Sequence, residues 1–322
     1  MPVPCLSIPR FNHSSACSFA LLTVLFPAII LVSSASCALA QTAGHPSPLQ
    51  RKLQAIANDA KGKVAVACAL PGSSLNCDLN AHSAPPMQSV FKAPLALAVL
   101  HQVELGKLSL DQPIRFLPSD RILPHAYSPL WDKYPDANVH VPLRELLRLA
   151  VSLSDNVAAD ILLRIVGGER PVADYIASLG VPGFHLLDNE NALHHDVAVQ
   201  YRNTFEPTGA VEFLRLISDH SPLMPEHTNL LLSWMDSSRL NTRIGGDLPP
   251  GVRVAHKSGT SDVDAGLAHA TNDIGLITLP DGRRLAIAVF VTDSRADDAT
   301  RDKIIARIAR AAYDAAVNPA RQ

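Results

Sequence analysis

The sequence contains 322 residues, of which 47% are hydrophobic and 18% charged, and its net charge is -2. A chain of this length and apolar content forms one large domain or two interwoven ones, which excludes a mainly disordered protein. The near-neutral charge and the 5% aromatic content argue against a nucleic-acid surface and against a polybasic membrane surface.

The first 40 residues have the pattern of an export signal. An apolar stretch covers residues 19–32, and Ala38-Leu39-Ala40 is typical of a cleavage site. We therefore expect a signal peptide over residues 1–40 and a periplasmic or secreted protein without stable membrane association after cleavage. A transmembrane anchor is the alternative, but Pro27 interrupts the stretch, which is short for a span of about 20 apolar residues.

Cys68 and Cys77 are the two cysteines of the expected mature chain, and an exported compartment permits disulfides. They flank a turn sequence, Pro71-Gly72-Ser73-Ser74, between alternating apolar segments over residues 64–68 and 75–79, which predicts a hairpin. A hairpin centred on the two middle residues of this turn would bring the cysteines opposite each other, with Cβ atoms about 4.5–5.5 Å apart. We expect a disulfide; two buried thiols are the alternative.

Apolar spacing in the rest of the chain predicts helices up to residue 235, then strands, and a closing helix. The predicted helices cover residues 50–59, 89–105, 141–149, 157–166, 171–179, 208–218, 229–235 and 300–317. The predicted strands that follow Gly251 cover residues 252–257, 268–278 and 285–291. Loops and short turns are expected over residues 111–140, and a long irregular segment over residues 181–204.

Predicted strands at both ends of the expected mature chain bracket a helical middle. This order indicates an α+β fold, in which an antiparallel sheet of about five strands, flanked by helices, is built from both chain ends and carries an inserted all-helical lobe. We expect residues 41–84 and 233–322 in the α/β lobe. Residues 85–232 would form the helical lobe, with an Ω-like loop near residues 184–206. A cleft between the two lobes is the expected place for a functional site.

Ser89 and Lys92 stand three residues apart at the start of the helix predicted over residues 89–105. Positions i and i+3 share a helix face, so the lysine amine can reach the serine hydroxyl. A serine attacks a carbonyl only when an adjacent base activates it. Alone, the Ser-x-x-Lys pattern is weak evidence, because it occurs by chance in many long chains.

Two further motifs follow in the chain. Ser154-Asp155-Asn156 lies between two predicted helices, where these residues could equally be a helix cap. Lys257-Ser258-Gly259-Thr260 ends a predicted strand, where it could be a simple turn with a solvated lysine. In this order and at these separations, the three motifs together resemble those of the serine penicillin-recognising enzymes, which include class A β-lactamases and penicillin-binding proteins.

A fourth segment distinguishes between these two groups. Asn189-Glu190-Asn191-Ala192-Leu193-His194 resembles the Ω-loop of class A β-lactamases, with His194 in place of the usual asparagine. This departure, together with Asp196, Gln200-Tyr201 and Asn203, resembles the branch that includes the PER-type extended-spectrum enzymes. The C-terminal part agrees with this branch over residues 254–261, 270–273 and 279–283.

The resemblance implies hydrolysis of β-lactams, penicillins and cephalosporins among them, through an acyl-enzyme. Ser89 would attack the lactam carbonyl, with Lys92 or a water bound to Glu190 as the base. The backbone amides of Ser89 and Thr260 would form the oxyanion hole. Ser154 would pass a proton to the departing nitrogen, and Glu190 would activate the water that releases the product.

The same resemblance implies that substrate is bound by Asn156 at its acylamino group and by Lys257, Ser258 and Thr260 at its carboxylate. Arg243 would supplement carboxylate binding and Tyr127 would line the rim of the cleft; a surface arginine and a core tyrosine are the alternatives. His194 is expected either to help position the deacylating water or to brace the loop.

No cofactor and no metal are expected, because the thirteen histidines are scattered without metal-ligand spacing. The expected partner is a small β-lactam molecule, with no nucleic acid, and the resemblance implies a monomer. One alternative is a D-alanyl-D-alanine carboxypeptidase or penicillin-binding protein, against which Glu190 argues. Another is a β-lactam sensor domain that stays acylated, which the cleavable signal and the lack of a signalling domain disfavour.

Overall fold

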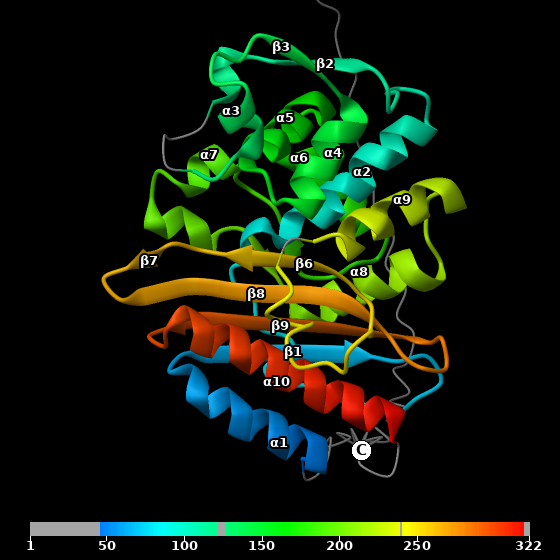
Figure 1. Ribbon diagram of the computed structural model, residues 1–322, viewed down its shortest axis with the longest axis vertical. Coiled ribbons are helices and arrows are strands. Elements are labelled where there is room, and N and C mark those ends of the chain that lie inside the picture. The colour runs from blue at the N-terminus through cyan, green and yellow to red at the C-terminus, as the bar shows by residue number, and fades with distance from the viewer. Residues whose placement is uncertain (1–45, 122–125, 239, 319–322) are drawn as a thin grey trace, which may run out of the picture. The chain divides into compact units, whose positions relative to one another are not determined.

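The computed structural model describes residues 46–121, 126–238 and 240–318, so the expected signal peptide lies outside the described residues. Within them, one antiparallel sheet has the strand order β1-β9-β8-β6, with β7 paired to β8. The five strands are β1 (Lys63–Ala69), β6 (Val254–Thr260), β7 (Val263–Asp264), β8 (Leu267–Thr278) and β9 (Arg284–Ser294). The first strand comes from the N-terminal part and the others from the C-terminal part, which confirms the predicted α+β fold (Figure 1).

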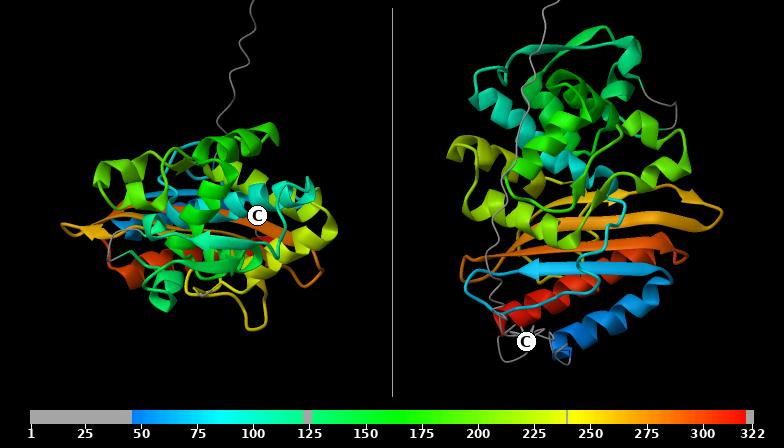
Figure 2. Two further views of the ribbon diagram at one scale, coloured as in Figure 1. Left: turned by 90° about the horizontal axis from the view of Figure 1, so that it is seen from above. Right: turned by 180° about the vertical axis from the view of Figure 1, so that it is seen from behind.

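Helices cover both faces of this sheet. Helices α1 (Pro48–Ala57) and α10 (Asp298–Val317) pack together on one face, whereas α8 (Pro207–Asp219) packs on the other (Figures 1 and 2). Alternate residues of β9 therefore enter two different apolar clusters. Val289 belongs to the cluster that includes α1 and α10, and Phe290 belongs to the cluster that continues into the helical lobe. Both faces of the central strands are buried, and β9 accordingly has a continuous apolar run over residues 285–291. β8 instead carries buried polar residues at position 269 and over residues 271–273.

The helical lobe is built around α2, whose residues from Lys92 to Leu100 are all buried. The α-helices outside the sheet layers are α2 (Lys92–Glu104), α3 (Pro129–Lys133), α4 (Leu143–Ser152), α5 (Asn156–Val166), α6 (Glu169–Ser178), α7 (Glu190–Leu193) and α9 (Pro225–Asp236). Short 3₁₀ helices are η1 (Asn58–Ala60), η2 (Gln88–Phe91), η3 (Pro118–Asp120) and η4 (Val197–Tyr201). The lobe boundaries given above remain a prediction.

The nucleophile segment begins differently from the prediction. The predicted helix over residues 89–105 starts as the 3₁₀ turn η2 and becomes α-helical only at Lys92. Pro94 then falls in the first turn of α2, where a missing N–H leaves no intrahelical bond unmade.

Two small sheets were not predicted. β2 (Pro113–Phe116) pairs with β3 (Val139–Pro142), and β4 (Phe184–His185) pairs with β5 (Thr204–Phe205). The prediction of only loops and turns over residues 111–140 is therefore wrong in part. Strands this short show too little alternation to reveal themselves in the sequence.

The predicted hairpin over residues 64–79 forms only in part. β1 pairs along its length with β9, and the returning segment meets it through a single bridge between Val66 and Leu79. The side chain of Asn76 accepts from the backbone N–H of Asp78, a local bond that competes with strand pairing. The register is nevertheless the predicted one, and a disulfide joins Cys68 to Cys77 with Cα atoms 5.4 Å apart.

Candidate active site

A cleft of about 240 Å³ lies between β6 and the helical lobe, and it brings together residues of the predicted motifs. Its walls are formed by Ser89, Tyr127, Ser152, Leu153, Ser154, Asn156, His194, Ser238, Leu240, Lys257, Ser258, Thr260 and Asp262. Glu190 borders a smaller adjoining cavity of about 40 Å³ that also reaches Ser89 and Thr260. This volume has room for at least one water molecule, which needs about 10–15 Å³ by this kind of measure.

Ser89 lies in η2, directly beside β6. A Cβ atom placed on Gly259 of β6 would lie 2.5 Å from the carbonyl oxygen of Met87 and 3.3 Å from the amide nitrogen of Ser89. Only glycine allows this approach, so the Lys257–Thr260 motif needs its glycine for backbone packing. The Ser89 hydroxyl donates a 3.2 Å hydrogen bond to Oε1 of Glu190.

Lys92 is entirely buried, and its amine contacts three oxygen atoms. Nζ lies 2.9 Å from Oε1 of Glu190, 2.8 Å from the carbonyl oxygen of Ser154 and 2.5 Å from Oδ1 of Asn156. An ammonium group has three N–H donors and no acceptor. Three acceptors around Nζ therefore fit a charged lysine that pairs with Glu190.

The loop that carries Glu190 is fixed by a residue that the sequence reasoning missed. The Asp160 carboxylate on α5 accepts the backbone N–H of Glu190 at 2.8 Å and that of Asn191 at 3.0 Å, at the start of α7. Burial, followed by the nearby charge of Glu190, raises the pKa of Asp160 to about 7. An aspartate inside the otherwise apolar run over residues 157–163 was the available sequence signal.

Ser154 stands between two lysines. The backbone of Ser154 has a φ of +59°, which is a strained conformation for a residue other than glycine. This conformation aims its carbonyl at Lys92, while its hydroxyl accepts a 3.0 Å hydrogen bond from Nζ of Lys257. Burial, followed by the charge of Lys92, holds the pKa of Lys257 well below its usual value.

Asp155 and Asn156 begin α5. Asp155 is buried and caps the helix by accepting the backbone N–H of Ala158, and it also accepts from Ser128 and from the backbone of Leu130. The helix-cap interpretation therefore holds for Asp155, and the cap leaves Ser154 and Asn156 at the cleft wall. Nδ2 of Asn156 lies 3.3 Å from Nε2 of His194, so the amide of Asn156 links Lys92 to the Ω-like loop.

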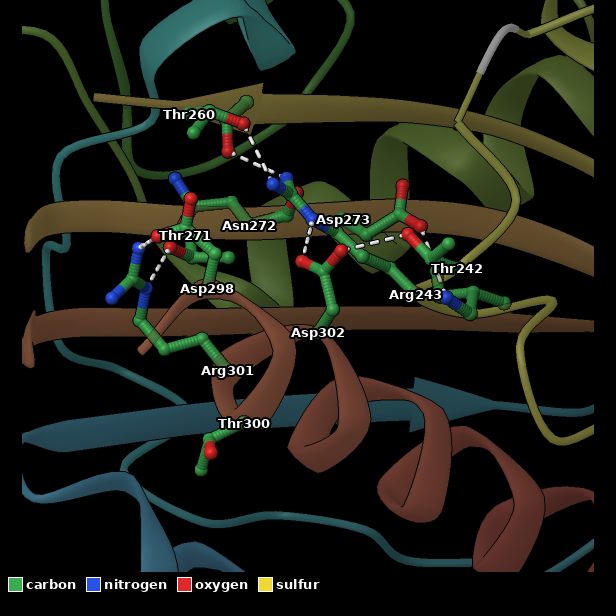
Figure 3. A network of polar contacts seen from close by, with 12 residues as sticks. Thr242, Arg243, Thr260, Thr271, Asn272, Asp273, Asp298, Thr300, Arg301 and Asp302 are labelled. Atoms are coloured by element: carbon green, nitrogen blue, oxygen red, sulfur yellow. Dashed lines mark hydrogen bonds and ion pairs between the residues drawn. The ribbon is translucent and has the colours of Figure 1, made fainter. Parts of the chain in front are cut away.

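Arg243 is buried rather than exposed. Its guanidinium donates to the carboxylate of Asp302, to two backbone carbonyls and, at 2.7 Å, to Oγ1 of Thr260 (Figure 3). Arg243 therefore orients the hydroxyl of Thr260, while Ser258 and Thr260 line the cleft themselves. Tyr127, 39% exposed, lies at the cleft wall.

The cleft also has wall residues that sequence reasoning did not identify. Ser238, Leu240 and Asp262 line it, and no motif marks them because they lie in connecting segments whose course depends on the fold. In the part of the chain that the structure describes, no group of three or more histidine, cysteine, aspartate or glutamate side chains is arranged to hold a metal ion.

A family model described as the β-lactamase enzyme family matches residues 48–316. The chain belongs to the β-lactamase enzyme family. Among curated proteins, this β-lactamase is 39% identical over 274 residues to the extended-spectrum β-lactamase PER-1 of Pseudomonas aeruginosa, an alignment that covers 85% of this chain and 89% of the relative. The predicted resemblance to the PER-type branch is confirmed.

Solved structures agree with this assignment. A β-lactamase from Chitinophaga pinensis is 42% identical, with a TM-score of 0.80 over 83% of this chain and 99% of that one. A class A β-lactamase from Bacteroides cellulosilyticus is 32% identical, with a TM-score of 0.77 over 84% of this chain and 99% of that one. The β-lactamase is thus a class A enzyme in fold as well as in sequence.

Proposed function

We propose that this class A enzyme hydrolyses the lactam amide through an ester on Ser89 that Glu190 removes. One observation supports this most strongly: Oε1 of Glu190 lies within hydrogen-bonding distance of both Ser89 Oγ and Lys92 Nζ. A nucleophile in contact with a base, which is itself oriented by a third group, is the arrangement that covalent catalysis requires.

Glu190 is the proposed base for the first step. The Ser89 hydroxyl already donates to Glu190, whereas Lys92 uses its three donors on Glu190, Ser154 and Asn156. As Oγ of Ser89 bonds to the lactam carbonyl carbon, its proton passes to the Glu190 carboxylate. The charge that develops on the carbonyl oxygen is stabilised by the backbone amides of Ser89 and Thr260.

The carbon–nitrogen bond then breaks and the departing nitrogen needs a proton. We assign Ser154 as its donor, since the hydroxyl of Ser154 lies in the cleft and is bonded to Lys257. The substrate carboxylate, bound beside Lys257, favours the ammonium form of that lysine. Lys257 then returns a proton to Ser154. The proton that Glu190 took from Ser89 passes through the cleft to Lys257, so the Glu190 carboxylate and the Lys257 ammonium are both restored before the second step.

The second step releases the product. Glu190 takes a proton from a water molecule in the small cavity beside Ser89, and the hydroxide bonds to the ester carbon. The carbon–oxygen bond to Ser89 breaks, and the proton held by Glu190 returns to Oγ. This step is what separates a hydrolase from a peptidase or sensor that remains acylated.

The remaining cleft residues bind and orient substrate. We assign Asn156 to the acylamino group, Ser258 and Thr260 to the carboxylate, and Tyr127 to the rim. Arg243 supports carboxylate binding through Thr260, to whose hydroxyl it donates. His194 braces the loop through Asn156.

Penicillins and cephalosporins are the proposed substrates, with oxyimino cephalosporins included because the relative PER-1 is named an extended-spectrum enzyme. The enzyme is proposed to act as a periplasmic or secreted monomer after removal of residues 1–40. Within the described residues, every helix is too short or too polar to span a bilayer.

Steady-state hydrolysis of benzylpenicillin, an oxyimino cephalosporin and a carbapenem by the purified mature chain tests the function. We expect repeated turnover of the first two substrates, with no adduct accumulating in the intact mass spectrum. A stable adduct at one equivalent without turnover would instead indicate a penicillin-binding protein or a sensor.

A further inference from the structure

Asn272 occupies an unusual position for a polar residue. It lies in the middle of β8, fully buried, on the face where Ile274 and Leu276 join the apolar cluster shared with the helical lobe. Within the described residues, its Oδ1 atom has no hydrogen-bond partner. A buried unpaired acceptor costs about 1–3 kcal/mol of stability.

The other end of the Asn272 amide contacts the segment that leads to the nucleophile. Nδ2 donates a 2.8 Å hydrogen bond to the carbonyl oxygen of Pro86. Two residues later, Gln88 has a φ of +48°, which is a strained conformation for any residue with a Cβ. The amide of Met87 donates to the carbonyl of Asn203, so this segment is held from both sides.

The backbone of Asn272 is fixed to the strand that carries the second oxyanion amide. Asn272 pairs with Gly259 of β6, the residue before Thr260. Nη1 of Arg243 donates to the carbonyls of both Gly259 and Asn272, at 2.9 and 2.8 Å, while Nη2 donates to Thr260 (Figure 3). Asn272 is thus rigidly coupled to the end of β6.

We propose that Asn272 is a positioning residue that sets the spacing between the backbone amides of Ser89 and Thr260. Its side chain holds the segment before Ser89, and its main chain holds the strand before Thr260. This inference rests on the proposed function, in which those amides bind the oxyanion. Loss of one such donor typically slows an enzyme by about 10²–10³-fold, and a displaced donor loses part of that effect.

Asn272→Leu separates this role from a structural one. The substitution removes the donor to Pro86 together with the unpaired acceptor, at similar volume. We expect a Tm close to that of the wild type, because loss of the unpaired acceptor offsets loss of the bond to the buried Pro86 carbonyl. We also expect a kcat at least about 10-fold lower for benzylpenicillin and a KM that changes less. Phenylboronic acid forms a tetrahedral anion when Oγ of Ser89 bonds to its boron and the hydroxyl proton passes to Glu190. Its inhibition constant should rise by a similar factor.

Asn272→Asp provides a pH-dependent rescue. Facing the carbonyl of Pro86, a protonated aspartic acid can donate as the amide does, whereas its carboxylate cannot. The activity of Asn272→Asp relative to wild type should therefore rise as the pH falls, and that of Asn272→Leu should not. Thr292→Val, on buried strand β9 of the same sheet, is the matched control and should keep the wild-type kcat.

Two outcomes would overturn the inference. One is a wild-type kcat and boronate affinity in Asn272→Leu; the other is an activity loss that follows a lower Tm, with no recovery of Asn272→Asp at low pH. Both require an active wild-type enzyme. Absence of turnover in the wild type would contradict the proposed function instead.

Discussion

Lys92 and Glu190 form a buried ion pair, with Nζ of the lysine 2.9 Å from Oε1 of the glutamate. The lysine lies at the start of α2, directly after the η2 turn that carries Ser89, and the glutamate lies on the Ω-like loop. The pair therefore joins the two segments that carry the chemistry. The same oxygen accepts the hydroxyl of Ser89. Stability and catalysis therefore depend on the same few atoms.

Removal of the lysine should destabilise the fold strongly. Lys92→Met leaves the Glu190 carboxylate buried without its partner, and breaking a buried pair in this way typically lowers the free energy of unfolding by about 3–5 kcal/mol. Denaturant unfolding measures this quantity. Arg170→Ala removes an exposed pair with Asp174 and should change stability by less than about 1 kcal/mol. Equal effects of the two substitutions would contradict the account.

Asp160 should make stability depend on pH. Its pKa, raised from 3.8 to about 7 in the folded state, means that the folded protein holds a proton that the unfolded chain has already lost. The contribution of this bound proton to the free energy of unfolding is fully present below about pH 4 and is lost as the pH rises to about 7. The loss amounts to about 1.4 kcal/mol for each pH unit that separates the folded from the unfolded pKa.

Asp160→Asn removes that titration. The Tm of the variant relative to the wild type should therefore increase between pH 5 and pH 8, because only the wild type loses the contribution. Thermal unfolding of both proteins across this range tests the sign. Parallel profiles would show that Asp160 has an ordinary pKa in the folded protein.

His194 should affect binding more than turnover if it braces the loop. His194→Ala removes its contact with Asn156, a hydrogen bond of about 0.5–1.5 kcal/mol, so KM for acylamino substrates should rise about two- to ten-fold. The matched control is His195→Ala, at the adjacent exposed position, which should leave both kcat and KM unchanged. A kcat that falls about 10-fold or more with KM unchanged would assign His194 to water positioning instead.

The disulfide should matter for stability alone. Cys68→Ala with Cys77→Ala opens a short loop on β1, an edge strand that β9 and β8 separate from β6. We expect a loss of about 2–3 kcal/mol in unfolding free energy with kcat/KM unchanged. Reduced wild-type protein should unfold like the variant. Unequal Tm values for these two proteins would contradict this expectation.

The sequence predicted the sheet and the long helices well because their apolar patterns are strong. The continuous run over residues 285–291 marks a strand buried on both faces, as β9 is. The run over residues 75–79 looked equally regular, but the local bond of Asn76 to Asp78 competes with pairing there. Short-range polar contacts of this kind leave no periodic signal.

The site was predicted through motifs, and what the motifs omit could not be predicted. Lys92 and Lys257 are fully buried, which follows from tertiary packing rather than from spacing. Asp160 interrupts the apolar run over residues 157–163 and could be flagged, whereas Asn272 lies between Thr271 and Asp273, where no apolar pattern marks it. Their partners, the Glu190 amide and the Pro86 carbonyl, become visible only in the fold.

Intact mass spectrometry of Glu190→Ala with benzylpenicillin, combined with steady-state turnover, tests the central claim most directly. The account predicts a penicilloyl adduct on Ser89 that persists, with turnover reduced by at least about 10²-fold, as for a lost general base. The wild type under the same conditions should show turnover and no lasting adduct. Unchanged turnover in Glu190→Ala would contradict the assignment of Glu190 as the residue that completes hydrolysis.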